Sequence, residues 1–207
     1  MQRTSGNGSD WLLDRCGCLT ASQFDAVMSK LKNGSYGAGR ATYMGQVIAE
    51  RLTGVPTDGF QSSAMLWGIE TEPLAIAAYE AYQFVTVEPA AFIRHPCIEW
   101  SGASPDGLVG DDGLVEAKCC NTSTHIERLL GAPVPRKYLL QTHWQMACTG
   151  RQWADLVYFD PRMPSNLQLH VERIQRDDGL IAEMESEAVV FLAEVASKVE
   201  ALRKVAA

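Results

Sequence analysis

Apolar residues recur at intervals of three and four positions along the C-terminal part of the chain. The repeat comprises Ile181, Met184, Ala188, Leu192, Val195, Val199 and Leu202. These intervals place the residues on one side of an α-helix, which completes a turn in about 3.6 residues. The segment is therefore expected to be an amphipathic helix that packs on the body of the protein or on another subunit.

Shorter patterns in the rest of the chain predict a mixture of helices and strands. Helices are expected over residues 20–32, 41–52, 70–82 and 135–149, and strands over residues 92–94, 101–103, 114–119, 154–159 and 167–174. The glycine-rich residues 33–39 predict a loop between the first two helices. This order predicts an α/β (α+β) fold in which helices flank a central mixed sheet and the amphipathic helix closes the chain.

The size and composition of the chain are typical of a soluble globular protein. It has 207 residues, of which 46% are hydrophobic, so residues 1–207 are expected to form one domain with a substantial core. No run of about 18 apolar residues is present, and the N-terminus lacks the apolar stretch of a signal peptide. A cytoplasmic location is therefore expected.

The cysteines do not have the spacing of a metal site. They stand at positions 16, 18, 97, 119, 120 and 148, without a Cys-x-x-Cys pair. Reduced thiols are expected, and no iron–sulfur cluster.

The net charge of −7 is unusual for a protein that binds nucleic acid. The charges are unevenly distributed, however. Basic residues predominate between Asp25 and Glu50 and between Asn121 and Ala154, whereas acids concentrate in the last helical segment. A basic inner surface and an acidic outer one are compatible with the total, and ordinary solvated faces are the alternative.

Two carboxylates and a lysine form the most informative motif. Asp106 stands in Ser104-Pro105-Asp106-Gly107, and Glu116-Ala117-Lys118 follows in a short predicted strand. Alternate side chains of a strand share a face, so Glu116 and Lys118 point the same way. Pro105 and Gly107 favour an end or a bend in the preceding strand, which directs Asp106 toward that face.

These groups suit metal-dependent hydrolysis of nucleic acid. Asp106 and Glu116 offer the hard oxygen ligands that Mg²⁺ or Mn²⁺ prefers, and the backbone carbonyl of Ala117 is a further candidate ligand. Lys118 would orient the attacking water or assist its deprotonation. The competing interpretation is a β-hairpin whose acid and lysine form an ordinary surface pair.

Glu72 is a third candidate carboxylate. It lies in the stretch from Trp67 to Pro73, where the proline and the acids indicate the first turn of a helix. A plain acid at a helix start is the alternative, and Trp67 is expected in the core.

Taken together, the motifs resemble the lambda exonuclease (YqaJ-type) viral recombinase family of the PD-(D/E)xK nuclease superfamily. The matching blocks are Arg15 to Ser22, Leu66-Trp67-Gly68 with Glu72, Ser104 to Leu108, Glu116 to Cys119, Gln141 with Gln145-Met146, and Trp153 to Arg162. They occur in the family's order and spacing. Cys120 departs from the pattern, because the family often has proline there.

The resemblance implies a restriction-endonuclease-like core and a role for each matching residue. Asp106, Glu116 and the Ala117 carbonyl resemble the metal ligands, supported by Glu72; Lys118 resembles the catalytic lysine, with Gln141 beside the site. Arg15 resembles the residue that binds the 5′-phosphate, Ser22 and Ser104 resemble hydroxyl contacts near that phosphate or the metal, and Met65 resembles the apolar wedge that helps part the terminal base pair. Arg15 as a surface residue and Met65 as a core residue are the alternatives.

The resemblance also implies an activity. Family members are similar in forming a trimeric ring that digests duplex DNA from 5′ to 3′ with Mg²⁺, releases mononucleotides and leaves a 3′ single strand. The implied partner is a single-strand annealing protein in phage or prophage recombination inside a bacterial host. The alternatives are an endonuclease of the same superfamily and a catalytically silent DNA-binding subunit.

Overall fold

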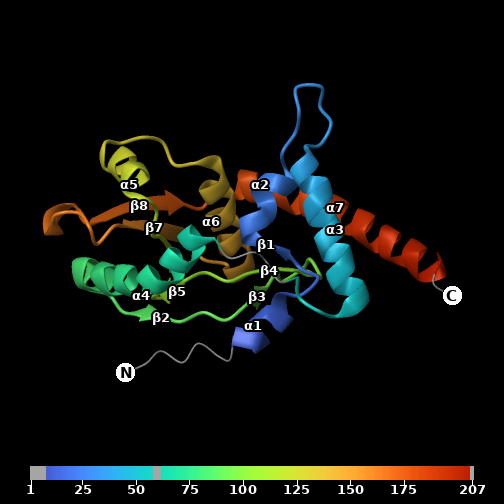
Figure 1. Ribbon diagram of the computed structural model, residues 1–207, viewed down its shortest axis with the longest axis horizontal. Helices are drawn as coiled ribbons and strands as arrows, with labels where there is room; N and C mark the ends of the chain where they lie inside the picture. Colours follow the sequence, from blue (N-terminus) through green and yellow to red (C-terminus); the bar gives the residue numbers. More distant parts are fainter. Residues whose placement is uncertain (1–7, 58–61, 206–207) are drawn as a thin grey trace.

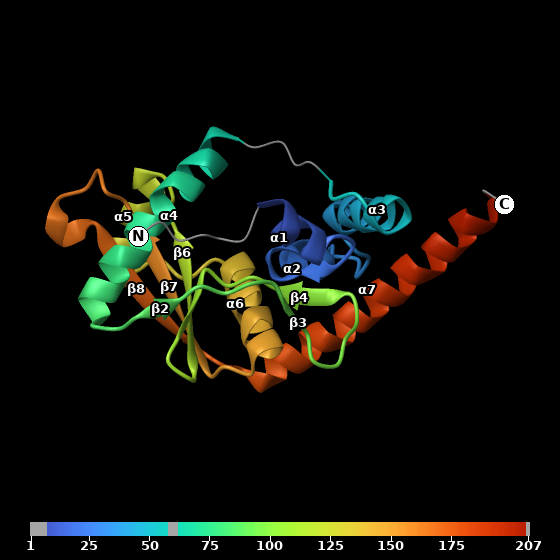
Figure 2. The ribbon, with the colours of Figure 1, turned by 90° about the horizontal axis from the view of Figure 1, so that it is seen from below.

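The centre of the molecule is a mixed five-stranded sheet, seen here in a computed structural model that describes residues 8–57 and 62–205 (Figures 1 and 2). The strand order is β2 (Val87–Glu88), β5 (Gly107–Val109), β6 (Gly113–Lys118), β7 (Trp153–Phe159) and β8 (Leu169–Gln175). Strands β6 and β7 are parallel, and every other neighbouring pair is antiparallel. The predicted α/β fold with a mixed sheet is confirmed.

A smaller sheet lies beside the first. Strand β4 (Ser101–Ala103) pairs in parallel with β1 (Leu19–Thr20) and antiparallel with β3 (Ile93–Arg94). The chain passes directly from β4 to β5, and hence from the small sheet to the large one, through residues 104–106. Asp106 therefore lies at the junction of the two sheets.

Helices cover both faces of the large sheet. Helix α6 (Arg136–Thr149) packs on one face, where Trp144 is fully buried against Phe24, with their ring centroids 4.2 Å apart. Helix α4 (Ser63–Gln83) packs on the other face through Ala75, Ile76 and Tyr79. Strand β6 is consequently buried from both sides, as a strand with a parallel partner usually is.

The remaining helical elements surround this core. They are α1 (Gly8–Arg15), the 3₁₀ turn η1 (Ala21–Gln23), α2 (Phe24–Val27), α3 (Ala38–Thr53), α5 (Thr122–Leu129), the 3₁₀ turn η2 (Ser165–Leu167) and α7 (Asp178–Val205). Helix α7 is the predicted amphipathic helix, and six of its seven periodic apolar residues are buried. Its C-terminal half extends away from the large sheet beside α3 (Figure 2). No helix within the described residues is both long enough and apolar enough to cross a bilayer.

The helix predicted over residues 70–82 was expected to start within residues 67–73, and this start is wrong. Helix α4 begins earlier, at Ser63, because the side chain of Ser62 accepts a hydrogen bond from the Met65 backbone N–H at 3.3 Å and caps the helix. Pro73 thus lies inside the helix rather than in its first turn. Proline there removes one backbone hydrogen bond, and the packed face of α4 maintains the helix nevertheless.

The helix predicted over residues 20–32 is also wrong. The apolar spacing of Phe24 and Val27 supports only η1 and the single turn of α2. Beyond them the chain forms a projecting hairpin-like loop, closed by a bridge between Lys30 and Tyr36 (Figure 1). Hydrogen bonds from Lys30 and Tyr36 to Glu187 of α7 anchor this loop.

Candidate active site

Strand β6 carries the acid and the lysine of the motif on one face. Leu114, on the same face, belongs to the core beneath α6, whereas Val115, on the opposite face, belongs to the core beneath α4. Glu116 and Lys118 therefore point toward α6, where the Lys118 Nζ atom lies 2.6 Å from Glu116 Oε1. Both side chains are largely buried, with 5% of Glu116 and 15% of Lys118 exposed, which excludes an ordinary surface pair.

Asp106 reaches the same strand from the junction of the two sheets. Its Oδ2 atom accepts a hydrogen bond from the Ala117 backbone N–H at 2.7 Å. This bond holds the Asp106 carboxylate beside the peptide that joins Glu116 to Lys118. The structure thus brings the three residues of the motif together.

Two glutamines of α6 fix the Glu116 carboxylate. Gln141 Nε2 donates to Glu116 Oε1 at 2.6 Å, while its Oε1 accepts from Lys118 at 3.1 Å. Gln145, one turn later, donates to Glu116 Oε2. The sequence interpretation gave Gln145 no role of its own, although its spacing of four from Gln141 places both on one side of a helix. Tyr138 was also missed, and its ring centroid lies 4.7 Å from Lys118 Nζ.

A pocket of about 200 Å³ opens onto these groups. Asp106, Glu116 and Gln141 line one part of it, together with Arg15, which ends α1. The rest of the lining consists of Thr20, Ala21, Ser22, Phe92 and Ser104. The pocket therefore combines two carboxylates with a guanidinium and two serine hydroxyls.

The charges in the site perturb one another. Burial raises the pKa of Asp106 well above its ordinary value, and the negative charges of Glu116 and Glu72 raise it further. Burial would lower the pKa of Lys118, but the adjacent Glu116 outweighs this effect, so the pKa is raised. Burial together with Glu72 and Asp106 raises the pKa of Cys119 to about 12, which keeps this thiol protonated. Negative charge is thus in excess around Asp106.

The donor chemistry fits a divalent cation. Two carboxylates meet in one pocket, burial and then the charge of Glu116 raise the pKa of Asp106, and the neighbouring Cys119 is a neutral thiol. Among the described residues, no three His, Cys, Asp or Glu side chains are close enough to form a complete set of ligands. Further ligands would have to come from the Ala117 carbonyl, from water or from a DNA phosphate, all of which are oxygen donors suited to Mg²⁺.

Four predicted residues lie outside the pocket lining: Ala117 and Lys118, which adjoin it on β6, and Glu72 and Met65 of α4. Glu72, half-buried in the middle of α4, acts on Asp106 through its charge. Met65, in the first turn of α4, is 52% exposed, so the alternative of a core position is wrong.

The comparisons with known proteins identify a family. Residues 10–152 match the model of the YqaJ-like viral recombinase domain. The chain belongs to this family. The resemblance drawn from the motifs is therefore confirmed, although no curated protein matches the chain.

The fold of this chain is also similar to that of solved exonuclease structures. An alkaline exonuclease from Laribacter hongkongensis, LHK-Exo, is 45% identical, with a TM-score of 0.89 over 95% of this chain and 97% of its own. A second structure of LHK-Exo, in complex with dAMP, matches equally well. A phage-related exonuclease from Haemophilus somnus 129PT is 15% identical, with a TM-score of 0.69 over 89% of this chain and 96% of its own, and shares the fold.

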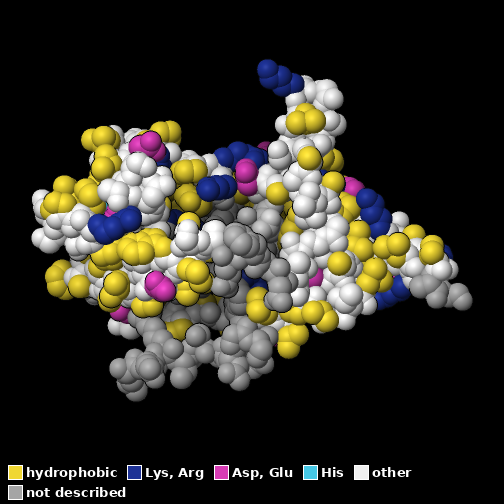
Figure 3. Space-filling model, in the orientation of Figure 1, with side chains coloured by type: hydrophobic (Ala, Val, Ile, Leu, Met, Phe, Trp, Pro, Cys, Tyr) yellow, Lys and Arg dark blue, Asp and Glu magenta, His cyan; other side chains and the backbone are white. Residues whose placement is uncertain are grey.

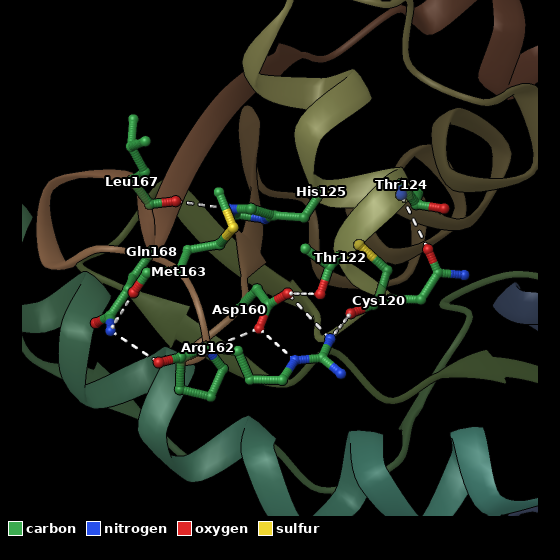
Figure 4. A network of polar contacts seen from close by, with 11 residues as sticks. Cys120, Thr122, Thr124, His125, Asp160, Arg162, Met163, Leu167 and Gln168 are labelled. Atoms are coloured by element: carbon green, nitrogen blue, oxygen red, sulfur yellow. Dashed lines mark hydrogen bonds and ion pairs between the residues drawn. The ribbon is translucent and has the colours of Figure 1, made fainter.

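The last family block, which ends at Arg162, forms a network beside the end of β6 (Figure 4). Asp160 is fully buried and accepts hydrogen bonds from the Arg162 side chain at 2.7 and 3.0 Å and from Thr122 at 2.6 Å. The Arg162 guanidinium also reaches the Cys120 carbonyl and lies 4.7 Å from the centroid of the Trp67 ring on α4. Arg162 thus connects the end of β6 to α4, a role that the sequence interpretation did not assign.

Most basic residues of the two basic stretches form ion pairs or hydrogen bonds within the fold. Lys30 pairs with Glu187, Arg40 with Glu194, and Arg136 with Asp25. Arg128 and Arg151 donate to backbone carbonyls. On the face shown in Figure 3, Lys and Arg side chains lie in separate places among apolar and acidic ones. A basic inner surface stays a prediction.

Proposed function

We propose that this protein is a Mg²⁺-dependent exonuclease that digests double-stranded DNA from 5′ to 3′, releases mononucleotides and leaves a 3′ single strand. The observation that carries the proposal is the shared pocket, in which Asp106 and Glu116 lie with Arg15. Carboxylates suit a divalent cation, and a guanidinium suits a phosphate. The 45% identity to an alkaline exonuclease, also solved with a deoxynucleoside monophosphate, supports the same chemistry.

Each pocket residue has a proposed task on the terminal nucleotide. Arg15 binds the 5′-phosphate through paired hydrogen bonds, and the hydroxyls of Ser22 and Ser104 bind the same phosphate or its neighbour. Met65, exposed at the start of α4, is the proposed wedge against the terminal base pair. These contacts would orient the first phosphodiester toward Asp106 and Glu116.

Asp106, Glu116 and the Ala117 carbonyl are the proposed ligands of Mg²⁺ or Mn²⁺, and the charge of Glu72 supports them. The chemistry that a bound divalent cation supplies is activation of water and neutralisation of charge on the phosphate. Gln141 and Gln145 hold Glu116 in one orientation, because they donate to its two oxygens. Lys118 donates hydrogen bonds from its ammonium group to the attacking water and the developing negative charge.

We also propose a homotrimeric ring that encloses the duplex, and a single-strand annealing protein as the partner that receives the exposed strand. Membership of the viral recombinase family supports both. A ring explains how a protein of net charge −7 stays on DNA, because an enclosed duplex cannot diffuse away between cuts.

The test compares two DNA substrates in Mg²⁺ and in EDTA. Linear duplex with 5′-phosphates, labelled at either end, should lose its 5′ label first as mononucleotide, whereas covalently closed plasmid should remain intact. EDTA should stop the reaction. Light scattering of the same sample should give three times the mass of the chain.

Other outcomes would refute the proposal. Cutting of the closed circle would indicate an endonuclease, and loss of neither substrate would indicate a silent DNA-binding subunit. Earlier loss of the 3′ label would reverse the proposed polarity.

A further inference from the structure

Arg15 enters the pocket from a tight turn at the end of α1. The backbone N–H of Cys18 donates to the Arg15 carbonyl at 3.0 Å, and β1 begins immediately afterwards. Gly17 within the turn has a φ of +70°, a left-handed conformation that favours glycine. The position of Arg15 therefore depends on the contacts made by the backbone N–H and carbonyl of Gly17.

The buried carboxylate of Glu50, near the end of α3, holds one side of this turn. Its Oε2 atom accepts the Gly17 backbone N–H at 2.7 Å. Its Oε1 atom accepts from Gln46 Nε2 at 2.9 Å and from the Thr57 backbone N–H at 3.1 Å. Glu50 is only 7% exposed, so these bonds replace the water that an ionised carboxylate requires.

Arg51 holds the other side of the turn. Its Nε atom donates to the Gly17 carbonyl at 2.9 Å, and its guanidinium carbon lies 4.4 Å from the centroid of the Trp100 ring. Trp100 has a φ of +60°, and its carbonyl accepts the Leu19 backbone N–H at 2.8 Å. The turn that carries Arg15 is thus fixed at both the N–H and the carbonyl of Gly17 by consecutive residues of α3.

We propose that Glu50, assisted by Arg51, is a positioning residue that sets Arg15 for recognition of the 5′-terminal phosphate, an assignment that rests on the proposed function. Glu50 does not line the pocket and touches none of the proposed metal ligands. Its effect on Arg15 therefore passes through the turn and through its negative charge, which acts on the guanidinium. A partly buried guanidinium that is displaced loses the paired geometry that phosphate recognition requires.

The test uses the full-length Glu50→Gln variant, which has nearly the same volume but replaces one acceptor oxygen with an amide donor. Initial rates are measured in Mg²⁺ on linear duplexes that differ only in a 5′-phosphate or a 5′-hydroxyl. The preference for phosphate should fall about tenfold, mainly through a higher KM on phosphorylated ends, because end recognition is weakened and the chemistry is not. Hydroxyl ends should be digested within about twofold of the wild-type rate. Glu127→Gln, an exposed acid on α5, is the matched control and should retain the full preference.

A double-mutant cycle separates positioning from a general structural role. If Glu50 acts through Arg15, Glu50→Gln should cause no further loss of preference in an Arg15→Ala background. Should Glu50→Gln fail to fold by circular dichroism, Arg51→Gln replaces it, because it releases the carbonyl of the same residue, Gly17, and a smaller loss in the same direction is expected.

Three results overturn the assignment. They are an unchanged phosphate preference in the folded variant, an equal loss on both kinds of end, and an additive loss in the double mutant. A wild-type protein that digests neither end would refute the proposed function, and this assignment with it; an active wild type with one of the three results refutes the assignment alone.

Discussion

Replacement of Lys118 by alanine tests the proposed chemistry most directly. The Lys118 ammonium lies 2.6 Å from Glu116 Oε1 and 3.1 Å from Gln141 Oε1, so it occupies the face of β6 on which hydrolysis is proposed. Removing one hydrogen-bond donor that stabilises negative charge in the transition state lowers a rate by about 10²–10³-fold. We therefore expect kcat to fall by that factor, equivalent to a barrier higher by about 3–4 kcal/mol.

The same change should have a smaller effect on folding. Loss of one member of a buried ion pair costs about 3–5 kcal/mol when the other is left without partners. Here Gln141 and Gln145 continue to donate to Glu116, so a loss of about 1–3 kcal/mol in the free energy of unfolding is expected. The variant should remain folded at 25 °C and bind DNA with unchanged affinity.

Single-turnover digestion of end-labelled duplex measures the rate, and fluorescence anisotropy in EDTA measures binding. Lys137→Ala is the control, because the Lys137 ammonium lies 4.8 Å from the centroid of the same Tyr138 ring and, within the described part of the chain, makes no hydrogen bond to Glu116 or Gln141. Its rate should stay within about twofold of wild type. A Lys118→Ala enzyme that turns over within about threefold of wild type would remove this lysine from the mechanism.

Three further predictions concern the end-binding residue, the metal ligands and the network beside β6. Arg15→Ala should lower the preference for 5′-phosphate over 5′-hydroxyl ends by about 10–100-fold in a competition digest, since two charge-assisted hydrogen bonds are lost; an unchanged preference would place the end-binding site elsewhere. Asp106→Asn should abolish digestion and the increase in Tm that Mg²⁺ gives the wild type in thermal unfolding, and a retained increase would show that Asp106 is no ligand. Asp160→Asn should lower the free energy of unfolding at pH 7 by about 2 kcal/mol in urea titrations. Hydrogen bonds from Arg162 lower the pKa of Asp160 in the folded state, so this stabilisation is present above the unfolded pKa of about 3.9 and is lost progressively as the pH falls below that value. The two proteins should therefore converge in acid, and a constant difference would contradict the assignment.

The central part of the site could be predicted because it depends on local geometry. Alternation along β6 alone places Glu116 and Lys118 on one face, and Gln141 follows on a helix that the apolar pattern locates within one residue of its start. The periodicity of α7 was equally informative, because a helix of this length repeats its pattern many times.

Three of the short strands, β1, β2 and β5, were not predicted, whereas the short strands β3 and β4 lie where strands were expected. Strands β1 and β2 have two residues each and β5 has three, too few for any alternation to be visible. They exist because distant partners pair with them, as Leu19 pairs with Ser101. The start of α4 was missed for a related reason: Pro73 resembles a first-turn proline, and only the Ser62 cap shows that the helix begins ten residues earlier.

Buried polar and charged side chains are the other feature that could not be predicted from the sequence. In the sequence, Glu50 is one more acid on a predicted helix. In the structure it is buried, and its carboxylate accepts a hydrogen bond from a turn more than thirty residues away. Gln145 likewise resembles any polar residue of an amphipathic helix until α6 is packed onto β6. Such residues become visible only when tertiary packing determines which polar side chains lose their water.

The use of basic residues within the fold has a consequence for DNA binding. Affinity for duplex DNA normally rises with the number of phosphates that free lysines and arginines neutralise. Here Arg40 is 5% exposed in its pair with Glu194, and Lys30 and Arg136 are also paired with acids. These pairs reduce the positive charge that the cations offer to the duplex, so we expect a single subunit to bind DNA weakly and to lose it readily as salt rises. Digestion that persists at salt concentrations where a single subunit would dissociate must then come from enclosure of the duplex, and the oligomer, more than the surface charge, would determine how far the enzyme travels.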